Sequence, residues 1–430
     1  MKIQNVKGGY DFLPKEQKIR NYINDVLKRT FVQYGYEPIE TPILCYYDIL
    51  SDKYDEENDI LKEIYKLRDQ GDRKLGLRYD LTVPFAKLIA LNKNQIKFPF
   101  KRYEIAKSFR DGPVKVGRDR EFTQCDVDVV GLEGQFIEAE LMSLFVKAFD
   151  ELGIDIIIKY NSRNLMTGLI LECGVDSSLV SVVTTIIDKK DKVSTVEFRE
   201  MLREVGLNNK QLDDIINYFD MSLDELIKRF VDSKNDKIRK GIEELSQLKQ
   251  FLQGINIDAV CLFSSSLARG QNYYTGNVFE VYEKNGKLTG SIGAGGRYDK
   301  MITDFIDDGN IYPAVGISFG LSSIYELLKD NDMFNEKSDV DFYIIPMDTD
   351  IDSLKLANNL RKIGFNVEIE MQKRKLKKSL EYANKEKIAY VIIVGENEII
   401  NKKITVKDMF NNRSFDIELD KIELLQEFIK

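Results

Sequence analysis

Two short runs in the second half of the chain combine arginine, tyrosine and glycine in a way that suits chemistry on an anion. In the first, Leu267–Gly276, Arg269 stands beside a glycine and two tyrosines follow. An arginine in such an apolar, aromatic strand is expected to meet an anion, because guanidinium groups otherwise remain in solvent. The second run, Gly293–Asp299, places three glycines before an arginine and a tyrosine, so its backbone could approach a ligand closely. A plain β-hairpin with a glycine-rich turn would explain either run alone.

The chain contains no histidine, and this limits the chemistry available to it. Ser-His-Asp and Cys-His nucleophilic sites, HExxH zinc sites and histidine general bases are all excluded. Arginine, lysine, carboxylates, tyrosine, backbone groups and Mg²⁺ remain. They suit transfer between phosphate-bearing groups, where positioning and charge neutralisation do most of the work. A histidine-free chain could also be translated when histidine is scarce, although compositional drift explains the absence equally well.

A third candidate, Leu75–Pro84, is predicted to run from a strand into the start of a helix. Thr82 is expected to cap that helix, with Pro84 in its first turn. On this interpretation Asp80 is a solvated residue of the connection.

A predicted hairpin carries polar residues on one face of its second strand. Strand 98–110 is followed by a charged loop and by a return strand at 121–131. Because side chains alternate along a strand, four residues of the return strand share one face: Phe122, Gln124, Asp126 and Asp128. That face suits a polar pocket built on a sheet, with a solvent-facing strand as the simpler alternative.

The remaining pattern supplies the elements that must position these residues. An amphipathic helix is predicted at 16–33, with a strand at 37–44 after it. The stretch at about 165–254 is helical and charged, and its charge runs are expected to be solvated. After a linker, strands and helices alternate from 342 to 395, which predicts a small α/β domain with a largely parallel sheet. Lys373–Lys378 gives that domain a basic edge, which is either a salt-bridged surface or a contact for an RNA backbone.

Bulk properties place the chain among ordinary globular proteins. Its 430 residues are enough for two or three domains. A net charge of −8 argues weakly against nucleic-acid binding but leaves room for a local basic patch. Four scattered cysteines favour reduced thiols, and neither a signal peptide nor a membrane-spanning run is apparent. We therefore expect a cytoplasmic protein that does not enter a membrane.

Together, and at this separation, the two arginine- and glycine-containing runs resemble the two signature peptides of histidyl-tRNA synthetases. The rest of the chain follows that family in order. The helix and strand at 16–44 resemble motif 1 of the class II aminoacyl-tRNA synthetases, and the hairpin at 98–131 resembles motif 2. Tyr312–Tyr325, a predicted strand, turn and apolar helix, resembles motif 3.

The resemblance implies an α+β protein with a class II antiparallel-sheet catalytic domain at 1–328, interrupted by a helical insertion at about 165–254. A C-terminal α/β domain of the anticodon-binding type is implied at 338–430. The implied activity is that of a histidine–tRNA ligase, which activates L-histidine with ATP and Mg²⁺ to histidyl-adenylate and transfers it to tRNA(His). A homodimer is also implied, because motif 1 lies at the dimer interface in the family.

Roles for individual residues follow from the same resemblance. Arg110 and Arg269 are implied as the catalytic groups at the α-phosphate of ATP, and Arg118 as a further ATP-binding residue. The implied histidine-binding residues are Asp80, Thr82, Gln124, Asp128, Tyr273, Tyr274 and Tyr298. Among them, Asp80 and Thr82 match positions that hold the α-amino group, and Gln124 and Asp128 match positions that contact the histidine substrate. No metal site formed by the protein alone is implied.

The sequence also departs from the family pattern at several positions. Ser323 stands where motif 3 usually has an arginine that binds the γ-phosphate, and Gly112, Asp119 and Asn272 replace other common residues. Ser323 favours an alternative: a non-catalytic paralogue that serves as the regulatory subunit of ATP phosphoribosyltransferase in histidine biosynthesis. A second alternative is an amino-acid sensor that docks on tRNA without aminoacylating it. Arg110, Arg269, both signature peptides and the C-terminal domain favour the synthetase.

Overall fold

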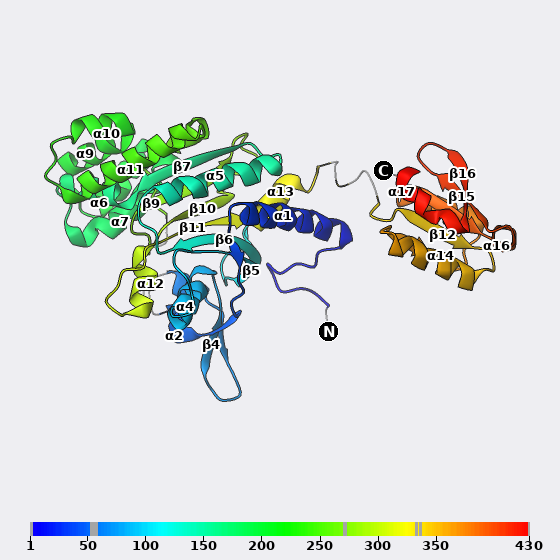
Figure 1. Cartoon of the computed structure of the whole chain (residues 1–430). Coiled ribbons are helices and arrows are strands. Elements are labelled where there is room, and N and C mark those ends of the chain that lie inside the picture. The colour runs from blue at the N-terminus through cyan, green and yellow to red at the C-terminus, as the bar shows by residue number, and fades with distance from the viewer. Residues whose placement is uncertain (1–2, 52–58, 270–272, 332–333, 335–337, 429–430) are drawn as a thin grey trace. The chain divides into compact units, whose positions relative to one another are not determined.

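The structure, a computed structural model, describes residues 3–51, 59–269, 273–331, 334 and 338–428. The chain forms two compact units, Met1–Lys329 and Asp330–Lys430. Figure 1 labels their helices and strands. None of the helices in the described ranges is both long and apolar enough to cross a membrane.

The first unit is built on an eight-stranded sheet. Its strands are β1 Glu37–Pro38, β5 Phe100–Phe109, β6 Glu121–Val130, β7 Ile156–Ser162, β8 Cys261–Phe263, β9 Asn277–Glu283, β10 Gly293–Arg297 and β11 Ala314–Gly320. They lie in the order β1-β5-β6-β11-β10-β9-β7-β8. The pairings from β5 across to β7 are antiparallel, whereas the short outer strands β1 and β8 pair in parallel with their neighbours. The predicted antiparallel sheet and α+β class are confirmed.

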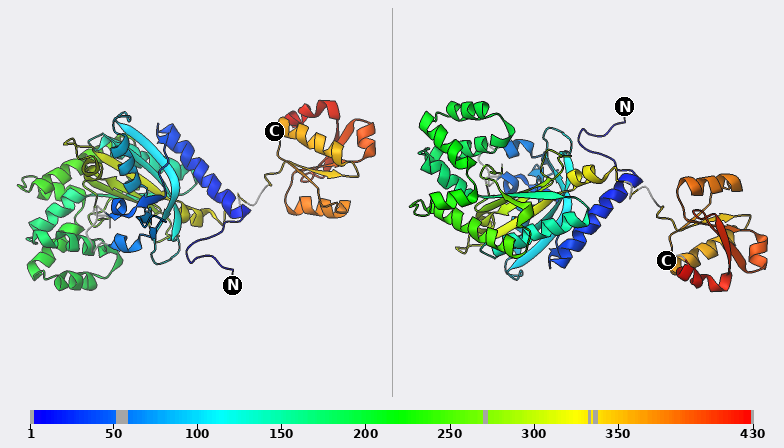
Figure 2. Two further views of the ribbon diagram at one scale, coloured as in Figure 1. Left: turned by 90° about the horizontal axis from the view of Figure 1, so that it is seen from below. Right: turned by 90° about the horizontal axis from the view of Figure 1, so that it is seen from above.

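Two long helices, α1 (Pro14–Gln33) and α5 (Phe136–Glu151), cover one face of this sheet (Figure 2). Their aromatic side chains meet at Phe319 of β11, whose ring centroid lies 5.6 Å from that of Phe31 and 4.7 Å from that of Phe145. Cys125, Val127 and Val129 of β6 are also buried. The alternate residues of β6 are therefore left for the opposite face, as the period of two predicts.

Shorter elements complete the first unit outside the insertion. The helices are α2 Tyr47–Ser51, α3 Asp59–Glu63, α4 Thr82–Asn92, α12 Asp299–Ile306 and α13 Leu321–Leu328. A second sheet has the order β2-β4-β3, with β2 at Leu44–Tyr46, β3 at Lys66–Arg68 and β4 at Lys74–Leu77. The single strand predicted at 37–44 is wrong, because β1 and β2 join different sheets. Pro38 and Pro42 lie on either side of the break between β1 and β2. Proline has no amide hydrogen to donate to a neighbouring strand, so it disfavours a continuous strand there.

The stretch predicted as a helical insertion forms a group of helices next to β7 and β9 (Figure 1). Its helices are α6 Arg163–Glu172, α7 Val180–Ile187, α8 Thr195–Glu204, α9 Asn209–Asp220, α10 Leu223–Arg229 and α11 Asp236–Gly254. Two glycines let α6 and α11 approach closely. A Cβ on Gly241 would lie 2.3 Å from the Leu165 nitrogen, and a Cβ on Gly168 would lie 2.6 Å from Ile238 Cγ1. Either substitution would push the helix backbones apart.

The second unit is a five-stranded sheet with helices. Its elements are β12 Phe342–Pro346, α14 Asp350–Lys362, β13 Val367–Ile369, α15 Leu376–Lys385, β14 Tyr390–Val394, α16 Glu396–Ile400, β15 Lys403–Asp408, β16 Arg413–Glu418 and α17 Leu425–Phe428. The order is β13-β12-β14-β15-β16, in which β13, β12 and β14 are parallel while β15 and β16 run antiparallel. The sheet is thus mixed rather than largely parallel. On the basic edge, Lys373 pairs with Asp350 at 3.2 Å and Arg374 with Glu370 at 3.0 Å.

Candidate functional site

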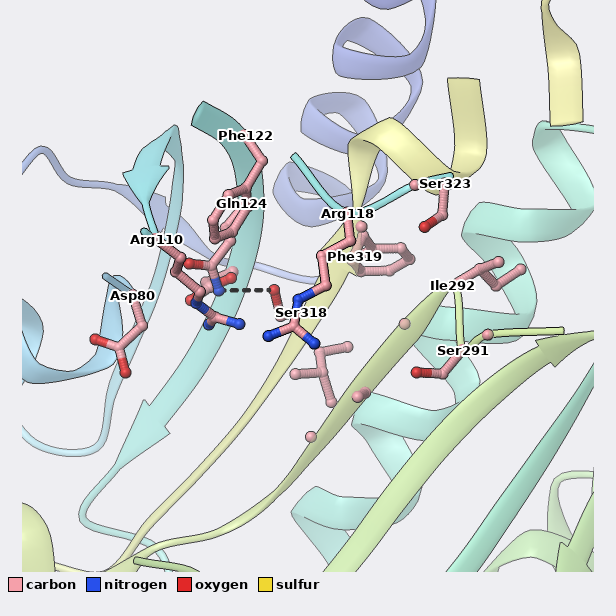
Figure 3. Close-up of a pocket in the computed structure, with 18 of the residues that line it drawn as sticks. Asp80, Arg110, Arg118, Phe122, Gln124, Ser291, Ile292, Ser318, Phe319 and Ser323 are labelled. Carbon is pink, nitrogen blue, oxygen red and sulfur yellow. Dashed lines mark hydrogen bonds between the residues drawn. The ribbon is translucent and has the colours of Figure 1, made fainter. Parts of the chain in front are cut away.

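A cavity of about 1080 Å³ lies in the first unit, over strands β6, β10 and β11 (Figure 3). Its volume lies just above the usual range for ligand pockets, about 300–1,000 Å³, so it has room for more than one small molecule. All ten residues that the sequence predicted for the site line it: Asp80, Thr82, Arg110, Arg118, Gln124, Asp128, Arg269, Tyr273, Tyr274 and Tyr298. The structure therefore brings together residues separated by more than two hundred positions in the chain.

Glycines on β10 and β11 make room for the polar groups of the cavity. A Cβ on Gly316 would lie 1.9 Å from Asp128 Oδ1, and one on Gly296 would lie 2.8 Å from the Tyr274 ring. A Cβ on Gly295 would collide with the Gly316 carbonyl oxygen at 2.2 Å. The run at 293–299 therefore needs glycine chiefly for contacts within the protein, in addition to the close ligand approach predicted from sequence.

Asp80 lies at one end of the cavity and is only 1% exposed (Figure 3). Its Oδ1 accepts a hydrogen bond from the Val83 amide at 3.1 Å, while its Oδ2 accepts none from the described residues. The expectation that Thr82 caps α4 is wrong: Leu81 is the capping position, Thr82 begins the helix, and the Asp80 carboxylate satisfies the Val83 amide. The expectation of a solvated Asp80 is wrong as well. Its second oxygen suits a cationic ligand group, because a buried acceptor is costly without a partner.

Burial of Asp80 predicts a pH dependence of stability. Burial raises the pKa of Asp80 from 3.8 to about 6, against the opposing effect of the Val83 amide. Between these values the folded state retains a proton that the unfolded state has lost, so the free energy of unfolding falls as the pH rises. Between pH 4.5 and 7 we expect the free energy of unfolding, measured with urea, to fall by about 2 kcal/mol less in Asp80→Asn than in the wild-type protein. Asp213→Asn, at an exposed carboxylate of α9, is the control and should retain the wild-type fall.

A network of buried charges lies beside Asp80. Arg102 of β5 is fully buried and forms an ion pair with Asp128 at 2.6 Å. Tyr298 donates a hydrogen bond to the other oxygen of Asp128. Burial raises the pKa of both Asp126 and Asp128, and the Arg102 guanidinium opposes the rise. The carboxylate of Asp128 is thus fixed in position by two partners while it lines the cavity.

Gln124 lies between the acidic end and the middle of the cavity. Its Nε2 donates to Ser318 Oγ at 3.4 Å, and its Oε1 accepts no hydrogen bond from the described residues (Figure 3). This buried amide oxygen is an acceptor for a ligand donor. The predicted polar face of β6 is confirmed as a wall of the cavity, because Phe122, Gln124, Asp126 and Asp128 all line it.

Three arginines contribute positive charge to the same cavity. Arg110 donates to the Tyr79 carbonyl at 3.0 Å and lies over the Phe122 ring, and Arg118 pairs with Glu63 at 2.9 Å. Arg269 pairs with Glu280 of β9. Arg269 is not in a strand as expected but in the connection between β8 and β9, with a positive φ of 59°.

The end of the cavity opposite Asp80 is closed by the hairpin loop and the start of α13. Ser323 lies at this end (Figure 3). A Cβ on Gly117 of the loop would approach Ser323 Oγ to 3.1 Å, and Ser322 donates to Asp119 at 3.0 Å. Gly112 is packed against Glu63, whose Oε1 would lie 2.8 Å from an added Cβ. The departure at Asn272 falls outside the described residues.

Sequence reasoning missed two charged residues that act on the site: Arg102, which holds Asp128, and Glu280, which holds Arg269. Neither contact follows from spacing along the chain, because each depends on how strands pair or approach. A signal for Arg102 exists, since it lies directly opposite Asp128 in the β5–β6 register. Together the groups can bind a cation at the carboxylates and an anion at the arginines. No cluster of three potential metal ligands occurs among the residues described.

Comparison with known proteins identifies the same architecture elsewhere. The family model described as histidyl-tRNA synthetase matches residues 8–324, and the anticodon binding domain model matches 341–427. The chain is 44% identical over 424 residues to histidine–tRNA ligase 1 of Bacillus anthracis, covering 98% of this chain and 99% of that protein. It is 34% identical to histidine–tRNA ligase of Clostridium acetobutylicum, with 96% and 97% covered.

Solved structures agree with these sequence matches. Histidyl-tRNA synthetase from Nostoc sp. PCC 7120 superposes with a TM-score of 0.86 at 28% identity, covering all of both chains. A protein described as an ATP phosphoribosyltransferase regulatory subunit/histidyl-tRNA synthetase from Bacillus halodurans C superposes with a TM-score of 0.76 over 91% of this chain and 97% of that one. At 20% identity the latter shows a shared fold and no more. With both of its family models matched in order and close relatives aligned along nearly its whole length, this chain belongs to the histidyl-tRNA synthetase family of aminoacyl-tRNA synthetases.

Proposed function

We propose that the chain is a histidine–tRNA ligase that activates L-histidine with ATP and transfers the histidyl group to tRNA(His). The observation that supports the activation step best is the joining of buried carboxylates and three arginines in one cavity. An amino acid brings an ammonium group and ATP brings phosphates, so both kinds of charge are needed. The volume of about 1080 Å³ suits the two substrates together.

In this proposal histidine lies at the acidic end. Its α-ammonium group is held by Asp80 Oδ2, a buried oxygen that has no hydrogen-bond partner among the described residues, with Thr82 beside it. The imidazole ring donates to the Gln124 and Asp128 acceptors, since each ring nitrogen that carries a proton is a donor. Three tyrosines close around the amino acid: Tyr273, Tyr274 and Tyr298. Their rings contact one another, with centroids 4.7 Å and 6.0 Å from that of Tyr273.

ATP lies across the arginines, with Mg²⁺ entering on its phosphates. A carboxylate oxygen of histidine attacks the α-phosphorus, the bond to the bridging oxygen of the β-phosphate breaks, and pyrophosphate leaves. Arg110 and Arg269 neutralise the charge that develops on the α-phosphate oxygens, so no proton transfer is needed in this step. The lack of a histidine general base is therefore no obstacle to the reaction.

In the second step a hydroxyl of the terminal tRNA ribose attacks the histidyl carbonyl carbon, the bond from that carbon to the phosphate oxygen breaks, and AMP leaves with the hydroxyl proton on its phosphate. The second unit, which matches the anticodon binding domain model, is proposed to bind the other end of the tRNA. A homodimer and a cytoplasmic location complete the proposal. The buried, unpaired thiols of all four cysteines support a reducing compartment.

The activation step is tested by ATP–pyrophosphate exchange with each amino acid in turn. We expect exchange with histidine and with no other amino acid, followed by histidine-dependent charging of tRNA(His). Ser323 still favours one alternative, a regulatory paralogue without ligase activity. Histidine binding without any exchange, together with capture of a short phosphoribosyltransferase, would favour that alternative.

Arg118 is proposed to take over part of the role of the arginine absent at position 323. Its side chain reaches into the cavity from the loop that packs on Ser323 (Figure 3). We expect Arg118→Ala to raise the KM for ATP about 10- to 100-fold, as loss of a charged hydrogen bond worth roughly 1.5–3 kcal/mol implies, and to leave the KM for histidine unchanged. Arg120→Ala is the matched control, because Arg120 ends the same loop and is likewise paired, with Asp111 at 3.2 Å, but does not line the cavity. Equal effects of the two substitutions would contradict this role.

A further inference from the structure

The segment at 264–269, which ends in Arg269, is bound on one side by the helical insertion. Ser265 Oγ donates to the Phe219 carbonyl of α9 at 2.6 Å. Ser266 Oγ donates to Asp191 Oδ2 at 2.9 Å, and the Ala268 amide donates to Asp188 Oδ1 at 3.4 Å. Asp188 and Asp191 follow directly after α7. Three hydrogen bonds therefore connect the insertion to the residues immediately before Arg269.

The carbonyl groups of this segment are bound by β7 and the start of α6. Asn161 of β7 is 1% exposed, and its Nδ2 donates to the Ser265 carbonyl at 2.8 Å and to the Leu267 carbonyl at 3.0 Å. Arg163 donates to the Ala268 carbonyl at 3.2 Å. The end of β7 and the first residue of α6 thus fix the carbonyl groups of the segment, and the part of the insertion from α7 to α9 supplies the other contacts.

Arg269 has a backbone conformation that needs such support. Its φ of 59° lies in the left-handed region, which is strained for a residue with a side chain and persists only where neighbours enforce it. Glu280 forms an ion pair with the guanidinium, and Tyr282 in turn donates a hydrogen bond to Glu280. The direction of the Arg269 side chain is therefore set by its backbone and by Glu280 together.

We propose that Asp188 and Asp191 are positioning residues for Arg269, and that the insertion in this way sets the rate of amino-acid activation. The inference rests on the proposed function, in which Arg269 meets the α-phosphate. Neither aspartate lines the cavity, so neither contacts a substrate. Their loss would let the segment relax and would displace the Arg269 guanidinium while the histidine-binding groups stay in place.

The test uses the double substitution Asp188→Ala and Asp191→Ala in the full-length protein. Since a misplacement of about 1 Å costs up to 10²-fold, we expect the kcat of ATP–pyrophosphate exchange to fall about 10- to 100-fold. The KM for histidine should not change, and Tm should fall by no more than it does in a control variant. Asp188→Asn with Asp191→Asn should restore most of the rate, because an amide oxygen still accepts both hydrogen bonds. A normal kcat in the double alanine variant would overturn the proposal. A double asparagine variant as slow as the double alanine variant would overturn it too.

The matched control is Asp224→Ala. Asp224 is an exposed aspartate of the insertion that pairs with Lys249 at 2.8 Å, much as Asp188 pairs with Lys192 at 3.0 Å. Hydrogen exchange of the amides of Leu267 and Ala268 gives a second readout that does not need activity. Both should exchange faster in the alanine pair and normally in Asp224→Ala; unchanged protection would also overturn the proposal. If the wild-type protein showed no ATP–pyrophosphate exchange, that result would instead contradict the proposed function. The protection of the two amides from hydrogen exchange would still decide this inference.

Discussion

Replacing Arg269 by alanine is expected to slow formation of the adenylate about 10²- to 10³-fold, as the loss of one preorganised donor to a developing charge does in other enzymes. Histidine affinity should hardly change, because Arg269 pairs with Glu280 and the groups proposed for histidine lie at Asp80 and Asp128. The measurements are the kcat of histidine-dependent ATP–pyrophosphate exchange and the histidine Kd from calorimetry.

The substitution leaves the Glu280 carboxylate without the cation that pairs with it, and a control must separate that effect. In Arg269→Ala combined with Glu280→Gln no uncompensated carboxylate remains, and the loss of kcat should persist. Glu280→Gln alone keeps the guanidinium and should lower kcat much less. Parallel losses of kcat and histidine affinity in Arg269→Ala would show that this arginine serves binding in general rather than the transition state.

Replacing Arg102 by methionine is expected to destabilise the protein by about 3–5 kcal/mol, because it leaves buried carboxylates without a counter-charge. Arg102 is 0% exposed and lies 2.6 Å from Asp128 and 3.7 Å from Glu104. It also lies over the Phe85 ring at 4.2 Å, so methionine retains part of the packing. Urea unfolding at pH 7.5 measures the change.

Lowering the pH should reduce the loss of stability that Arg102→Met causes. Without Arg102 the folded-state pKa of Asp126 and Asp128 rises further, since the guanidinium has the largest effect opposing burial at both carboxyls. A carboxyl whose folded pKa is raised contributes stability that is lost as the pH rises, so the variant should be closer to wild type at pH 5 than at pH 7.5. Lys101→Met, at the neighbouring residue of β5 with a partly exposed pair to Glu140, should cost about 1 kcal/mol or less. A similarly small, pH-independent loss for Arg102→Met would contradict the argument.

Much of the candidate site was predictable because its residues follow local rules. The two-residue period of β6 placed Gln124 and Asp128 on one face, and the structure puts that face in the cavity. The arginines and tyrosines of the site were predicted from the resemblance of short sequence runs to known motifs. These rules could not predict the residues that hold the site residues in place. Arg102 contacts Asp128 because β5 pairs with β6, and Glu280 of β9 contacts Arg269 of the connection before that strand. Spacing along the chain encodes neither contact.

The errors in the fold have equally specific causes. Thr82 has the right type for a helix cap, but Pro84 has no amide hydrogen and the Phe85 amide already donates to the Leu81 carbonyl at 3.1 Å, while the buried Asp80 carboxylate binds the Val83 amide. The mixed sheet of the second unit was missed because the prediction stopped at 395, before the hairpin of β15 and β16. A turn signal was present there, since Asn412 takes a φ of 49° that asparagine tolerates better than most residues.

The cavity is walled by carboxylates, arginines, tyrosines and glycines in a chain without histidine. The bound amino acid would therefore be the sole imidazole in the complex. In a heteronuclear magnetic resonance spectrum, every imidazole carbon–proton correlation would belong to the ligand, with no background from the protein to subtract. The ionisation and tautomer of histidine beside Asp128 could thus be followed directly in a 50 kDa protein, with neither isotope labelling of the chain nor substitution of any residue in it.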